Sequence, residues 1–396
     1  MRTTVRAVQL TTVLALALAT VGLVGISPAR ADAAFAVSSP ADDADGNVGD
    51  GTCSVAADGS GPCTLRAAID EANSTLSPTV ITVPPGTIVL GSELAIQSDA
   101  DVTVNGAGPG VSVLDGGDAT RHFSVNGSGS LTLADMTLQN GRDTGPGSVF
   151  TYGDLVLDRV ELVDNEATRG EGGALEVAAV EGHPPGTATI RSSTIAGNHA
   201  AREGGAIYAV YPGTSLTISN STITGNTTDG DGGGLVLDGA TTDLRFVTIV
   251  DNQAGDGAAG DAIAYGGEGD VTVTGSILEG GDDVCVLFEG PMTSGGGNVV
   301  GDDSCLLGGP GDLEGTTAGV QPLADNGGPT RTMALTTASP AVDHALADGC
   351  PSADQRRVAR PQREGCDAGA FELAADPVPA PPPAARPATA TPSFTG

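Results

Sequence analysis

Apolar and polar residues alternate in short runs along the middle of the chain. Leu131-Thr-Leu and Leu155-Val-Leu show the period of two that is typical of a β-strand with one buried face. Each run is followed by a second apolar or β-branched pair, an asparagine and a glycine-rich turn. No helical period of 3.6 residues appears within these segments. The pattern therefore predicts short strands joined by tight turns.

This order of residues repeats five times, and the repeat is the strongest signal in the chain. The repeated asparagines are spaced by 25, 33, 28 and 26 residues, and they are Asn140, Asn165, Asn198, Asn226 and Asn252. A period of ~20–50 residues is typical of a solenoid or a propeller. Three short strands in each unit favour an all-β parallel β-helix, and we expect eight to ten coils. Apolar side chains would then stack on their equivalents ~4.8 Å away. Each asparagine would occupy a left-handed corner, where its amide bonds along the stack.

The ends of the chain differ from the repeats. Arg2 and Arg6, an apolar run from Val13 to Val24 and small residues up to Ala33 predict a secretory signal. Residues Cys63–Asn73 carry apolar positions with helical spacing and predict a short capping helix. The expected organisation is a signal peptide at 1–33, an N-terminal cap at 34–78, β-helix coils at 79–320, a C-terminal capping segment at 321–373 and a Pro/Ala-rich disordered tail at 374–396.

The six cysteines fall into close pairs along the sequence. An even number of cysteines in an exported chain favours disulfides over a metal site. Sequential pairing is our preferred connectivity among the 15 that six cysteines allow. It joins Cys53 to Cys63, Cys285 to Cys305 and Cys350 to Cys366.

Composition narrows the range of functions. The 396 residues include 60 Gly, 7 Phe, 4 Tyr and no Trp, and the formal net charge is -32. All 17 basic residues are arginines. A nucleic-acid partner is excluded, because neutralising phosphates requires a basic surface. No segment after the signal is long and apolar enough for a membrane span. We therefore expect a secreted or cell-surface protein. We also expect it to be a monomer.

Three motifs resemble secreted bacterial proteins. Ser193-Thr-Ile-Ala-Gly-Asn198 with Glu203-Gly-Gly-Ala-Ile-Tyr208 resembles the repeat of polymorphic outer-membrane proteins and related right-handed, pectin-lyase-like β-helix proteins. Residues 63–73 resemble the CSLREA-type N-terminal cap, with Thr64 for Ser and Ala67 for Glu. Segments 325–330, 339–343 and 354–372 resemble the choice-of-anchor Q segment, which closes the β-helix in that family. The resemblance implies a right-handed parallel β-helix displayed outside the cell, in a family without a settled activity.

Two sets of residues are candidates for binding. Arg202, Glu203, Tyr208 and Tyr211 predict contact with a cell-surface or extracellular polysaccharide, in which tyrosine rings pack against sugars. Asp43, Asp45, Asn47 and Asp50 space their oxygens as in calcium-binding loops, and calcium is the cofactor they suggest. A flexible acidic loop is the alternative for the second set.

We interpret the chain as a non-catalytic scaffold for adhesion or glycan contact. The first alternative is a polysaccharide lyase or glycoside hydrolase acting on an acidic polysaccharide, with paired carboxylates or an arginine as the base. Candidate arginines are Arg159, Arg191, Arg202 and Arg245. The second alternative is a structural module stabilised by calcium.

Overall fold

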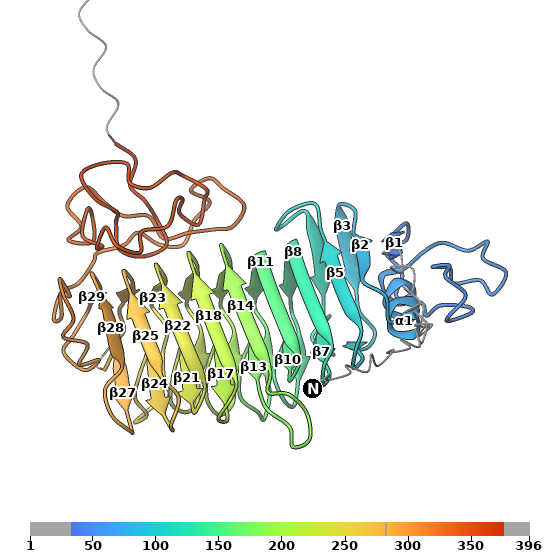
Figure 1. Ribbon diagram of the computed structural model, residues 1–396, viewed down its shortest axis with the longest axis horizontal. Helices are drawn as coiled ribbons and strands as arrows, with labels where there is room; N and C mark the ends of the chain where they lie inside the picture. The colour runs from blue at the N-terminus through green and yellow to red at the C-terminus, as the bar shows by residue number, and fades with distance from the viewer. Residues whose placement is uncertain (1–32, 282, 376–396) are drawn as a thin grey trace, which may run out of the picture. The chain divides into compact units, whose positions relative to one another are not determined.

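The computed structural model describes residues 33–281 and 283–375, and in this part the chain winds into stacked parallel strands (Figure 1). The predicted signal peptide lies outside the described residues except for Ala33, which begins β1. Most of the predicted tail at 374–396 also lies outside them. The strands form three sheets, and every pairing between the named strands is parallel.

The first sheet has two strips of stacked strands, because most turns of the chain contribute two consecutive strands to it. The first of these strands belongs to the first strip and the next belongs to the second strip. The residue between the strips adopts a positive φ, as at Arg159 (58°) and Ser192 (50°). Its strands are β1 (Ala33–Ala36), β2 (Thr79–Thr82), β3 (Gly86–Val89), β5 (Asp101–Asn105), β6 (Ser112–Asp115), β8 (Ser130–Gln139), β11 (Asp154–Val163), β14 (Thr187–Arg191), β15 (Thr194–Ala196), β18 (Ser215–Ser219), β19 (Thr222–Thr224), β22 (Thr241–Arg245), β23 (Thr248–Val250), β25 (Val271–Thr274), β26 (Ile277–Leu278), β28 (Thr293–Gly296) and β29 (Val299–Val300).

The other two sheets complete each turn. The second sheet contains β4 (Leu94–Ile96), β7 (Phe123–Val125), β10 (Val149–Thr151), β13 (Leu175–Val177), β17 (Ile207–Val210), β21 (Leu235–Asp238), β24 (Ile263–Gly266) and β27 (Cys285–Leu287). These eight strands, one from each coil, are separated by about seven complete turns, which agrees with the lower end of the eight to ten coils expected. The short third sheet contains β9 (Arg142–Asp143), β12 (Glu166–Ala167), β16 (His199–Ala200) and β20 (Thr227–Thr228).

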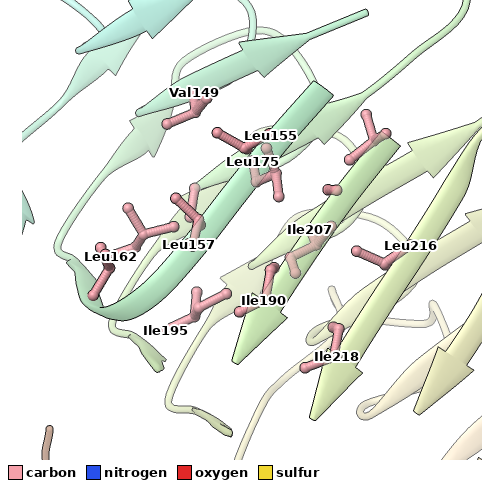
Figure 2. Close-up of a cluster of buried hydrophobic side chains, with 14 of the residues drawn as sticks. Val149, Leu155, Leu157, Leu162, Leu175, Ile190, Ile195, Ile207, Leu216 and Ile218 are labelled. Carbon is pink, nitrogen blue, oxygen red and sulfur yellow. The ribbon is translucent and has the colours of Figure 1, made fainter. Parts of the chain in front are cut away.

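The core is a continuous column of apolar side chains. Leu157 of β11 lies in register with Ile190 of β14, which in turn lies over Ile218 of β18. Figure 2 shows these side chains pointing into the interior together with Leu175 and Ile207 of the second sheet. All five are fully buried. Alternation along each strand thus places one residue in the core and the next on the outer surface.

Helix α1 (Leu65–Thr75) covers the first turns. Its apolar face packs into the same core through Leu65, Ala68, Ile69 and Ala72. The hydroxyl of Thr64 caps the helix by accepting a hydrogen bond from the Ala67 N–H at 3.0 Å. With 11 residues, α1 is too short to cross a membrane, and no other helix in the described ranges is long enough to do so. Disulfides join Cys53 to Cys63, Cys285 to Cys305 and Cys350 to Cys366, the sequential pairs expected.

Buried asparagines form a ladder along one corner of the stack. The side-chain amide of Asn198 donates to the side-chain oxygen of Asn226 at 2.8 Å, and the backbone N–H of Asn198 donates to the same oxygen at 3.0 Å. The same pair of bonds joins Asn165 to Asn198 and Asn226 to Asn252. These bonds satisfy polar groups that no water reaches.

Two details of the predicted corner are wrong. The left-handed residue is the one before each ladder asparagine, as at Asp164 and Gly197, and not the asparagine itself. Asn140 lies in this left-handed column with a φ of 52°, and its amide bonds Asp115 instead of the ladder. Gly141 takes the ladder position, where its N–H donates to Asn165. The reason is that the first repeat has one residue fewer between its strand and its asparagine.

Residues 321–373, which we call the C-terminal strap, lie along the second strip of the first sheet. Buried Gln355 donates to the Thr194 hydroxyl at 3.0 Å and accepts from the Thr222 hydroxyl at 2.7 Å. The Ala370 N–H donates to the Thr248 hydroxyl. Arg360 and Glu372 form a fully buried ion pair within the strap. These contacts hold the strap against the side of several successive turns. Its role as an end cap stays a prediction.

We predict that Asn226→Ala lowers the free energy of unfolding by about 3 kcal/mol, because it leaves buried groups on both neighbouring turns without partners. Guanidinium unfolding of the full chain measures this change. The matched control is Asn140→Gly, which removes an amide outside the ladder and keeps the left-handed backbone, with an expected change below about 1 kcal/mol. Equal effects of the two substitutions would show that the ladder adds no special stability.

Candidate functional site

The outer face of the second sheet brings together acidic and aromatic side chains. The residues that point outward from successive strands are Phe150 of β10, Glu176 of β13, Tyr208 of β17 and Val236 of β21. They lie in register, one strand spacing apart. Glu176 and Tyr208 are therefore direct neighbours on this face, although 32 positions separate them in the sequence.

A column of acids runs beside these strands. Glu171, Glu203 and Asp231 each precede a glycine with a φ near 68°, at Gly172, Gly204 and Gly232. Backbone bonds from Gly172 to Glu203 and from Gly204 to Asp231 show that the three acids occupy the same position in successive turns. Each glycine adopts the left-handed conformation that turns the chain into the next strand. Asp238, the last residue of β21, lies at the end of the same sheet. We call Glu171, Glu176, Glu203, Tyr208, Asp231 and Asp238 the acidic–aromatic face.

The side chains of this face influence one another electrostatically. Burial, and after it the charge on Glu171, raise the pKa of Glu176 to about 7 against the opposing effect of Arg121. Burial and the charges on Asp231 and Glu171 also raise the pKa of Glu203. The pKa of Tyr208 is raised by burial and then by Glu203. Like charges held at one strand spacing in a partly desolvated surface explain these directions.

A cleft of about 300 Å³ lies at one end of the face. It is lined by Glu203, Asp231, Val236, Asp238 and Phe288 among others. The Phe288 side chain is 62% exposed, which is unusual for a large apolar ring. The cleft therefore offers carboxylate oxygens and an aromatic surface to the same ligand, without an arginine in its lining.

Only two of the four residues that were predicted to contact polysaccharide belong to the acidic–aromatic face. Glu203 and Tyr208 lie on the acidic–aromatic face. Arg202 is largely exposed and forms an ion pair with Glu171 at 3.1 Å. Tyr211 lies in the turn after β17, is 53% exposed, and forms no ring pair with Tyr208 in the described part of the chain. Sequence reasoning missed Glu176, although an acid between buried Leu175 and Val177 marks an outward strand position.

The arginines considered as catalytic bases are all paired with carboxylates of the protein. Arg159 contacts both Asp135 and Asp158, and Arg191 also contacts Asp158. Arg245 contacts Asp243 at 2.7 Å. The neighbouring Asp135 and Asp158 raise the pKa of Arg159. Such a guanidinium stays protonated, and a protonated group cannot accept a substrate proton.

The predicted calcium loop is held by its own hydrogen bonds. Asp45 accepts from the backbone N–H groups of Asn47 and Ser54, and Asp50 accepts from the Asn47 amide and from Thr52. The backbone oxygen of Asp43 accepts from Thr64. Within 33–281 and 283–375, no three His, Cys, Asp or Glu residues are grouped as a metal site. Calcium binding by Asp43, Asp45, Asn47 and Asp50 stays a prediction.

One comparison with known protein families agrees with this architecture. A family model described as "Right handed beta helix region" matches residues 121–304. Among solved structures, pectate lyase Pel9A is similar, with a TM-score of 0.45, 14% sequence identity, and coverage of 84% of this chain and 96% of that chain. A comparison with curated proteins found no match. The chain is a right-handed parallel β-helix protein.

We predict that Glu176→Gln stabilises the protein at pH 8, where wild-type Glu176 must carry its charge in an unfavourable setting. The pKa of Glu176 is raised in the folded state, so its ionisation costs stability as the pH rises from 4.5 to about 7. The difference in melting temperature between the variant and the wild type should therefore disappear below pH 4.5. The exposed control Glu364→Gln removes one negative charge from the C-terminal strap, which lies along the first sheet and not on this face. An equal, pH-independent gain in both variants would contradict the shift.

Proposed function

We propose that the protein is an extracellular β-helix scaffold that contacts polysaccharide through the acidic–aromatic face, without cleaving it. The observation that carries this proposal is the in-register row of Phe150, Glu176 and Tyr208 on β10, β13 and β17. It lies beside the column of acids that recurs on successive turns. A linear polymer presents the same groups at regular intervals, so a periodic surface suits it better than it suits a small molecule. Carboxylates accept hydrogen bonds from sugar hydroxyls, and aromatic rings pack against the apolar faces of sugars.

The charge of this face favours a neutral polysaccharide. Glu171, Glu203 and Asp231 form a column of acids in which, among the described residues, only Glu171 has an ion pair, with Arg202. A polymer of uronic acids would bring further negative charge to this column and be repelled. A neutral ligand differs from the acidic polysaccharide that we expected as the substrate of a lyase or glycoside hydrolase.

The extracellular location is supported by the three disulfides, which form and persist in oxidising compartments. The resemblance of the two end segments to the CSLREA-type cap and the choice-of-anchor Q segment supports a protein displayed at the cell surface. Adhesion would then follow from glycan contact.

We predict that the wild-type chain binds neutral hexasaccharides and not hexagalacturonate. Isothermal titration with cellohexaose, mannohexaose and chitohexaose measures this preference. Tyr208→Ala should weaken binding at this face about tenfold, because it removes a ring worth about 1.4 kcal/mol. Thr217→Ala, which alters a half-buried outward position of the first sheet, is the matched control and should leave affinity unchanged. Preference for hexagalacturonate would overturn the proposal.

A glycoside hydrolase is the second candidate, and Glu176 favours it. A carboxyl with a pKa of about 7 is still partly protonated near neutral pH and can then act as a general acid. Glu171, Glu203 and Asp231 would supply the second carboxylate that glycosidic cleavage requires.

The two candidates make opposite predictions for product release. We expect no reducing ends from the neutral hexasaccharides after prolonged incubation at pH 5–8. Release that is abolished by Glu176→Gln and retained in Glu364→Gln would establish the hydrolase instead. A lyase would be recognised separately by ultraviolet absorption of an unsaturated product.

A further inference from the structure

The third sheet presents one outward side chain per turn. Arg142, Glu166, His199 and Thr227 lie in register on successive strands, and a further bridge pairs Thr227 with Gln253. The chemistry changes along this row. Arg142 and Glu166 neutralise each other in an ion pair of 2.8 Å. The next three residues are polar without this pairing, and Nδ1 of His199 lies 3.0 Å from the Thr227 hydroxyl.

A groove begins where the row becomes neutral. A cleft of about 420 Å³ is lined by His199, Thr227, Asp229, Gln253 and Asp256 together with small residues. A second cleft of about 530 Å³ shares residues 253–256 with the first, so the two join. We call the first cleft, which includes the shared residues 253–256, the third-sheet groove. It follows the stacking direction over three turns, and it lies on a different sheet from the acidic–aromatic face.

The polar groups of the groove have unused hydrogen-bonding capacity. Within the described ranges, the side-chain amide of Gln253, Nε2 of His199 and the carboxylates of Asp229 and Asp256 have no hydrogen-bond partner in the protein. Ala254 and Gly255 place no large side chain over them.

We propose that the third-sheet groove is a second binding site for a linear neutral polysaccharide. The ligand class rests on the proposed function, whereas the site itself does not. Donors and acceptors follow one another at the strand spacing of ~4.8 Å, which is close to the repeat of an extended hexose chain. The amide of Gln253 can donate to one hydroxyl and accept from another, and the two carboxylates accept from hydroxyls. The groove has no arginine in its lining, so an anionic polymer would not be held.

The test is titration of the full chain with cellohexaose, mannohexaose and chitohexaose. The wild type should bind two molecules of the preferred hexasaccharide. Gln253→Ala and His199→Ala should each weaken one of these events about tenfold and leave the other unchanged. Arg142→Gln, which alters the same row outside the groove, is the matched control and should change neither event. Melting temperatures of all variants show that the fold is retained.

The outcomes separate this proposal from the proposed function. Binding that is lost in Tyr208→Ala and unaffected by both groove variants overturns the groove and leaves the acidic–aromatic face standing. Binding that is lost only in the groove variants supports the groove and overturns the face. An amine-bearing chitosan hexamer is titrated alongside the three neutral hexasaccharides. If it is the only one of the four that binds, the groove selects charge and not hydroxyls, and the inference is wrong. The absence of any binding overturns both.

Discussion

The structure depends on hydrogen bonds that run from each turn to the next along the stack. The backbone N–H and C=O groups of the strands bond to the strands of neighbouring turns. The side-chain amides of the buried asparagines form hydrogen bonds in the same direction. A turn can accept this arrangement only if its strands and corners have the same lengths as those of its neighbours. Extra residues are therefore restricted to loops, as in the long turn that contains residues 180–186.

This constraint also orders the surface. Because like positions lie over like positions, a residue type that recurs in the sequence becomes a row of identical groups in space. The motif of an acid followed by two glycines gives the column of Glu171, Glu203 and Asp231. The same stacking keeps their charges close, which is why burial and neighbouring acids raise the pKa of Glu203. A bound ligand rich in hydroxyls would donate hydrogen bonds to these carboxylates and so lower the free-energy cost of their repulsion.

Much of the fold could be predicted from the sequence, because repetition makes local patterns reinforce each other. The core positions, helix α1 and the cysteine pairs all follow from spacing. The register of Asn140 could have been found by counting residues from the start of each strand, since Leu131 to Asn140 is one residue shorter than Leu155 to Asn165. The candidate site was harder to predict. Glu176 meets Tyr208 only through the exact length of an intervening turn, and the third-sheet groove depends on how neighbouring loops are shaped.

The C-terminal strap can cover the β-helix only after the turns beneath it have been synthesised. Thr194, Thr222 and Thr248 of the first sheet are covered by residues that are synthesised more than a hundred positions later. Turns made early must therefore stand with one flank open to water until residue 370 has emerged. A chain that ends before the strap would leave these threonine hydroxyls without their partners, and it would expose the apolar side chains of Val250, Ile277 and Val299 that the strap also covers.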